Sequence, residues 1–113
     1  MVKINKNTKI VILLGGESLE REISISSGEN IIKSLSSQGF NAIPFDCKGD
    51  FIKNLIKIKP DVCFNALHGL GGEDGSVQSL LEKNNIPYTH SGISSSEICM
   101  NLSLIHISEP TRR

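Results

Sequence analysis

Apolar residues along the chain form short runs that are separated by glycine, proline and polar turns. The run at 9–14 is almost entirely β-branched or aliphatic, which is typical of a parallel strand buried on both faces. Similar runs predict further strands at 41–45, 62–67 and near 88–89. Because Pro44 cannot donate to a strand ladder, it favours an edge or end position for the second strand.

Between these strands, apolar and small residues recur at helical spacing. A helix is predicted within 20–38, and Gly39 is its expected stop because glycine readily adopts the left-handed conformation of a helix C-cap. Asp50 is expected to cap a second, short helix. The predicted inner face of that second helix consists of Phe51, Ile52, Leu55 and Ile56.

Two more helices are predicted towards the end of the chain. Asp74 or Ser76 is positioned to cap the third, and Ser94-x-x-Glu97 resembles a capping box that opens the fourth. Strands that alternate with helices indicate βαβ units and a parallel sheet. We therefore expect a three-layer, Rossmann-like α/β domain with a mainly parallel sheet of about four strands flanked by helices. Ligands of such sheets bind outside the carboxyl ends of the strands.

Composition narrows the class of protein. The 113 residues fit one small domain, and an apolar content of 38% with a charged content of 21% is ordinary for a globular chain. Twelve basic and twelve acidic residues balance, which gives no indication of a nucleic-acid or membrane surface. The irregular spacing of Cys47, Cys63 and Cys99 fits neither a disulfide framework nor a thiolate metal site. Reduced cysteines in a cytosolic protein are the simplest interpretation.

The loop after the first strand reads GGESLERE, at 15–22. It lacks the G-x-G-x-x-G pattern of a dinucleotide-binding loop. One interpretation is a tight glycine turn followed by solvated charges. The other is a carboxylate near a helix N-terminus, where the helix dipole favours negative charge and the carboxylate could hold a substrate ammonium group.

The loop after the third strand reads NALHGLGGEDG, at 65–75. His68 could be hydrogen-bonded to loop backbone, or it could donate to a substrate or act as a base. Glu73 and Asp74 are expected to stabilise the following helix rather than to bind a metal, since the other two histidines are distant. The residues alone thus indicate an α/β domain with a small-molecule site built from two loops.

Two long stretches carry a family resemblance. ILLGGESLEREISISSG at 12–28 and FNALHGLGGEDGSVQSLLEKNNIPYTHSG at 64–92 resemble the N-terminal domain of D-alanine–D-alanine ligases, and the resemblance runs from about residue 9 to residue 101. D-alanine–D-lactate ligases share these motifs, so the second substrate stays open. The resemblance implies the pre-ATP-grasp version of the expected fold, within the ATP-grasp superfamily.

The resemblance also implies an activity. Ligases of this family activate one D-alanine as an acyl phosphate, which the amine of a second D-alanine attacks, and the dipeptide enters peptidoglycan synthesis in the bacterial cytoplasm. ATP and Mg²⁺ are bound by two further domains, so no cofactor is expected on residues 1–113, which alone should be inactive. The full-length parent is expected to be a homodimer.

By the same resemblance, Glu20 matches the glutamate that holds the ammonium group of the first D-alanine, and His68 matches the active-site histidine. We take these two as the candidate catalytic residues. The substrate-binding candidates add four loop glycines, Gly15, Gly16, Gly71 and Gly72.

The likeness stops after Asn101. Residues 102–113, LSLIHISEPTRR, do not match the family's pattern, so we expect a substrate-binding domain at 1–101 followed by a foreign tail. The alternative function is a non-enzymatic α/β module that binds a small molecule or a partner protein. A Rossmann-type nucleotide domain is disfavoured by the missing fingerprint.

Overall fold

The computed structural model describes residues 4–16, 19–67, 76–90, 93–100, 105 and 107–108. The strands are β1 (Lys9–Leu14), β2 (Asn41–Asp46), β3 (Val62–Asn65), β4 (Tyr88–Thr89) and β5 (Ile107–Ser108). The helices are α1 (Arg21–Ser37), α2 (Ile52–Ile58), α3 (Ser76–Lys83) and α4 (Ser95–Met100).

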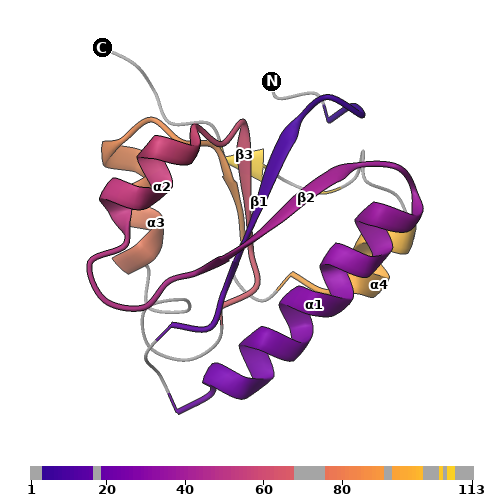
Figure 1. The fold of residues 1–113 in the computed structure, drawn as a ribbon, viewed down its shortest axis with the longest axis horizontal. Coiled ribbons are helices and arrows are strands. Elements are labelled where there is room, and N and C mark those ends of the chain that lie inside the picture. The colour runs from indigo at the N-terminus through magenta and orange to yellow at the C-terminus, as the bar shows by residue number, and fades with distance from the viewer. Residues whose placement is uncertain are drawn as a thin grey trace.

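The strands form one sheet in the order β2-β1-β3-β4-β5. Strands β1 to β4 are parallel, and β5 pairs antiparallel with β4. Helices α1 and α4 cover one face of the sheet, and α2 and α3 cover the other (Figure 1). The expected α/β class with a mainly parallel sheet is confirmed. The sheet has five strands rather than about four, because residues 107–108 add a short edge strand.

Strand β1 lies inside the sheet, between β2 and β3, and its side chains alternate between two apolar cores. Val11 and Leu13 pack with residues of α2 and α3, whereas Ile10, Ile12 and Leu14 pack with residues of α1 and α4. This explains the uninterrupted apolar run, since a strand covered on both faces has no side chain that points to water. Strand β2, which contains Pro44, is an edge strand, as the sequence predicted.

Helix α1 ends as predicted. Gly39 has a φ of +86°, and its N–H donates to the carbonyl of Ser36 while the N–H of Phe40 donates to the carbonyl of Leu35. These two bonds form a Schellman motif, which satisfies carbonyl groups that the helix leaves unpaired. The glycine therefore fixes the direction in which the chain leaves α1 and enters β2.

Two predictions for α2 were wrong. Its N-cap is Phe51 rather than Asp50, so the helix begins one residue later than a cap at Asp50 would require. Ile56 is 44% exposed, while Leu55 is fully buried and Ile58 packs against the core. At about 100° per residue, Ile58 returns to the face of Leu55 and Ile56 lies off that face.

Strand β3 is shorter than the predicted 62–67, because it ends at Asn65. The side-chain Oδ1 of Asn65 accepts a hydrogen bond from the N–H of Leu67 at 3.0 Å. This local bond turns the chain away from the ladder, as asparagine side chains commonly do.

Asp74, one of two cap candidates for α3, lies outside the described residues, and Ser76 is the first residue of that helix.

Residues beyond 101 also contact the domain. Ile107 pairs with Thr89 and Ser108 with Tyr88, and both Ile105 and Ile107 pack against the core beneath α1 and α4.

Cys47 and Cys63 are buried free thiols, and burial raises the pKa of Cys63 to about 12. In the portion of the chain that the structure describes, no helix has both the length and the apolarity needed to cross a membrane.

Candidate functional site

The first predicted loop leaves β1 through two glycines in the left-handed region. Gly15 has a φ of +73° and Gly16 a φ of +79°, a conformation that L side chains rarely adopt. The N–H of Gly15 donates to the hydroxyl of Ser24 at 3.1 Å. Both glycines therefore lie just beyond the carboxyl end of β1.

An ion pair holds the second of these glycines. The guanidinium of Arg21 donates to both carboxylate oxygens of Asp46, at 2.8 and 2.5 Å. The same Arg21 donates to the carbonyl of Gly16 at 2.7 Å, and Asp46 accepts the N–H of Gly16 at 3.2 Å. The hydrogen bond from Arg21 lowers the pKa of Asp46, so this carboxylate stays charged well into the acid range.

Glu20 occupies the N-cap position of α1, and its carbonyl accepts the N–H of Ser24 at 3.0 Å. The predicted location of this carboxylate, at a helix start, is confirmed. Glu20 is exposed, as is Glu22 in the first turn of α1. A negative charge at this end of a helix is favoured by about 0.3–1 kcal/mol.

Ser24 joins the first loop to the third strand. Its buried hydroxyl accepts the N–H of Gly15 and donates to the carbonyl of Ala66 at 2.9 Å. Ala66 in turn donates its N–H to the carbonyl of Leu13. The first loop and the segment that leads towards His68 are thus tied together through one serine. His68, Gly71 and Gly72 themselves lie outside the described residues, as do Glu73 and Asp74.

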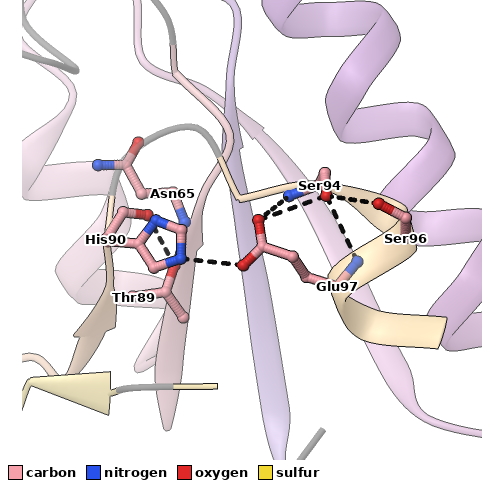
Figure 2. Close-up of polar contacts among 6 residues, drawn as sticks. All are labelled: Asn65, Thr89, His90, Ser94, Ser96 and Glu97. Atoms are coloured by element: carbon pink, nitrogen blue, oxygen red, sulfur yellow. Dashed lines mark hydrogen bonds and ion pairs between the residues drawn. The ribbon is translucent and has the colours of Figure 1, made fainter. Parts of the chain in front are cut away.

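A second polar cluster lies where β3 and β4 end (Figure 2). The N–H of Asn65 donates to the hydroxyl of Thr89 at 2.9 Å, and the carbonyl of Asn65 accepts the N–H of Ile93. Both Asn65 and Thr89 are fully buried. The Thr89 hydroxyl therefore replaces a ladder bond at the point where the two strands separate.

His90 follows directly, and its Nε2 lies 3.1 Å from a carboxylate oxygen of Glu97 at the start of α4 (Figure 2). The other Glu97 oxygen accepts the N–H of Ser94 at 3.3 Å, and the Ser94 hydroxyl accepts the N–H of Glu97 at 3.4 Å. This reciprocal pair confirms the predicted capping box. Glu97 thus caps α4 and contacts the histidine that follows the carboxyl end of β4.

Sequence reasoning missed three of these features: the Arg21–Asp46 pair, the Ser24 bridge and the His90–Glu97 contact. Their partners lie 25, 42 and 7 residues apart. Only the position of His90, one residue after a predicted strand, gave a signal. Among the described residues, no group of three or more His, Cys, Asp or Glu side chains is arranged to hold a metal ion.

Comparison with known proteins gives one consistent result. A protein-family model described as D-ala D-ala ligase N-terminus matches residues 50–91. A D-alanine–D-alanine ligase from Ruegeria sp. (strain TM1040) is 50% identical over 93 residues, which cover 82% of this chain and 30% of that protein. One from Francisella tularensis subsp. tularensis (strain WY96-3418) is 46% identical over 112 residues, with 94% and 38% covered. The chain belongs to the D-alanine–D-alanine ligase family, as an N-terminal domain.

Solved structures agree with this family. The D-alanine–D-alanine ligase of Bacillus anthracis matches with a TM-score of 0.60 and 34% sequence identity, over 85% of this chain and 32% of that one. The same Bacillus anthracis ligase has also been solved in complex with ATP. The chain spans about a third of the length of the ligases it matches. The ligase N-terminal domain is thus the part of the family that the described residues represent.

Proposed function

We propose that this domain binds the first D-alanine in an ATP-dependent ligase that joins two D-alanines for peptidoglycan synthesis in the bacterial cytoplasm. The observation that carries the proposal is the position of Glu20. It occupies the N-cap position of α1, and Ser24, one turn further along, ties this helix to the segment before His68. This contact supports the proposal, because it joins a residue of the first motif to a residue of the second, just beyond the carboxyl end of β3.

In this proposal the Glu20 carboxylate accepts hydrogen bonds from the ammonium group of D-alanine. Contacts between ions are the strongest class of hydrogen bond, and they are stronger still where water is excluded. Gly15 and Gly16 keep side chains out of the loop, so a small zwitterion can approach the backbone. His68 would face the reacting groups, either to polarise a carboxylate or to assist deprotonation of the attacking amine.

ATP and Mg²⁺ would be bound by other domains of the ligase, which correspond to the two thirds of its relatives that this chain does not match. When bound, they supply the phosphoryl group and the charge neutralisation that activate the substrate carboxylate. The present sequence has no Gly-Lys phosphate loop of its own. We therefore expect the 113-residue chain alone to release no phosphate from ATP. D-alanine-dependent phosphate release by this purified chain would contradict the assignment of ATP binding to other domains.

The test of the proposed role compares Glu20→Ala with Glu22→Ala in the full-length ligase. Both residues are exposed near the start of α1, so the two substitutions should alter the stability of the domain similarly. Loss of a hydrogen-bonded charge pair costs about 1.5–3 kcal/mol, so kcat/KM for D-alanine should fall roughly 10- to 150-fold in Glu20→Ala alone. The assay is phosphate release at varied D-alanine and saturating ATP.

Three other outcomes are informative. Equal kinetics in the two variants would remove Glu20 from the substrate site. A full-length protein that binds D-alanine but forms no dipeptide would favour the alternative, a non-enzymatic binding module. Mass analysis of the product formed from D-alanine and D-lactate together would decide which second substrate the enzyme uses.

A further inference from the structure

We propose that Arg21 and Asp46 form a positioning pair that sets the affinity for the first D-alanine by fixing the Gly16 peptide groups and the start of α1. The inference rests on the proposed function and extends it to two residues that would act through the loop rather than on the substrate itself. Arg21 is the first residue of α1 and follows Glu20 directly. Asp46 is the last residue of β2, so the pair joins the ends of two strands to the start of one helix.

The geometry differs from that of an ordinary surface ion pair. Arg21 and Asp46 contact each other through two hydrogen bonds, and each also binds one backbone group of Gly16. Arg21 takes the carbonyl, and Asp46 takes the N–H. One salt bridge therefore holds the peptide groups on both sides of the Gly16 Cα, which fixes the course of the loop as well as its distance from the sheet.

The preceding glycine is part of the same arrangement. A Cβ at Gly15 would lie 2.5 Å from a carboxylate oxygen of Asp46 and 2.9 Å from Nη1 of Arg21. The pair thus occupies the space that any side chain at this position would need. Glycine at position 15 is required by the pair as well as by its positive φ.

Stability alone is a poor explanation for the pair. The side chains of Arg21 and Asp46 are 36% and 40% exposed, and exposed ion pairs contribute little to folding free energy. Their contacts are instead concentrated on the loop beside Glu20. Substitutions should therefore change the placement of Glu20 far more than they change the melting temperature.

The test uses the full-length ligase with Asp46→Asn, Arg21→Lys and the double variant. Arg21→Lys keeps the charge but loses the planar fork that makes two parallel bonds. Since small displacements of a positioned group cost up to about 100-fold in rate, we expect KM for D-alanine to rise about tenfold in each single variant. KM for ATP should stay at its wild-type value. Because the residues act as a unit, the double variant should resemble the single ones.

Asp50→Asn is the matched control. It removes an exposed carboxylate four residues further along, outside the pair, and should leave both KM values unchanged. A second readout is amide hydrogen exchange at Gly16, which should accelerate in Asp46→Asn because its N–H loses a charged acceptor. This measurement does not depend on turnover.

The outcomes separate the two proposals. If the wild-type protein makes no dipeptide, the proposed function fails. If it does, but the variants keep the wild-type KM for D-alanine or the wild-type exchange rate at Gly16, the positioning role is wrong. A parallel loss of kcat and melting temperature with both KM values unchanged would identify the pair as merely structural and would also overturn the inference.

Discussion

Helix α1 packs closely against β1 at Gly28, and replacing this glycine by alanine tests how strongly that contact constrains the helix. A Cβ at Gly28 would lie 2.7 Å from Cδ2, 2.9 Å from Cβ and 3.3 Å from Cγ of Leu14. Cβ atoms essentially never come this close to another atom. Leu14 is the last residue of β1 and is itself buried, so its side chain has little room to move.

Two effects of opposite sign decide the magnitude. Alanine in a helix interior is favoured over glycine by about 1 kcal/mol. Overpacking a filled core typically costs about 1–3 kcal/mol, and here the nearest atoms include the Cβ of Leu14, which cannot rotate away. The clash should outweigh the propensity gain in most of this range. The net cost is then about 0–2 kcal/mol, so we expect Gly28→Ala to lower the free energy of unfolding by about 1 kcal/mol, or the melting temperature by about 4–8 °C.

The matched control is Ser26→Ala, on the exposed side of the same helix. It should be neutral or slightly stabilising, because alanine has the higher helix propensity and meets no neighbour there. The assay is urea unfolding of the purified 113-residue chain, followed by circular dichroism. A Gly28→Ala chain as stable as the wild type would show that the helix shifts without cost, and the argument that this contact fixes α1 would fail.

Two further predictions concern buried and charged contacts. Thr89→Val should lower the free energy of unfolding by about 1–3 kcal/mol, because the buried N–H of Asn65 loses its acceptor. Thr89→Ser keeps the hydroxyl and should cost less. Equal urea midpoints for the two variants would contradict this prediction. The pKa of Asp46 is lowered in the folded state, so its contribution to stability is present above about pH 4 and is lost as the pH falls through the lower folded-state pKa. The difference in melting temperature between wild type and Asp46→Asn, which the exposure of the pair keeps small, should therefore shrink on acidification, and a difference that grew would refute the sign.

Much of the fold could be predicted because its signals are local. The apolar run of β1 indicates burial on both faces, and Gly39 marks the end of α1 because it adopts the left-handed conformation. The capping box at Ser94 and Glu97 is likewise readable over four residues. Each of these features can be predicted from a sequence pattern within a single element or at its ends.

The two wrong predictions, both for α2, concern features that depend on contacts with distant parts of the chain. Asp50 has a good capping side chain, but the helix begins after Phe51, which is buried against the core. Burial of an aromatic side chain outweighs a capping bond, which is typically worth about 1 kcal/mol. Likewise, local pattern placed Ile56 inside, although the face of α2 that meets the sheet is set by Leu55 and Ile58. Tertiary packing selected the helix start and face in both cases.

In the candidate site too, the residues of a local motif could be predicted, but the distant residues that hold them could not. The sequence led to Glu20 and the two loop glycines because they stand in a contiguous motif. The side chains that hold this motif come from elsewhere: Asp46 from the end of β2, and the carbonyl of Ala66 from the chain that follows β3. Such contacts join α1 and the loop before it to groups 25 and 42 residues further along the chain, so local sequence spacing gives no signal for them.

The small residues of α1 show why these supports belong together. Ser24 and Gly28 are one turn apart, and both are buried on the face that meets β1. The absence of a side chain at Gly28 lets the helix approach, and the Ser24 hydroxyl on the same face makes hydrogen bonds with Gly15 and Ala66. Arg21 and Asp46 then fix the next residue of the loop. A displacement of α1 at Gly28 would therefore be transmitted to Glu20 through two sets of contacts, so packing beneath the helix and charge at its start both control one carboxylate.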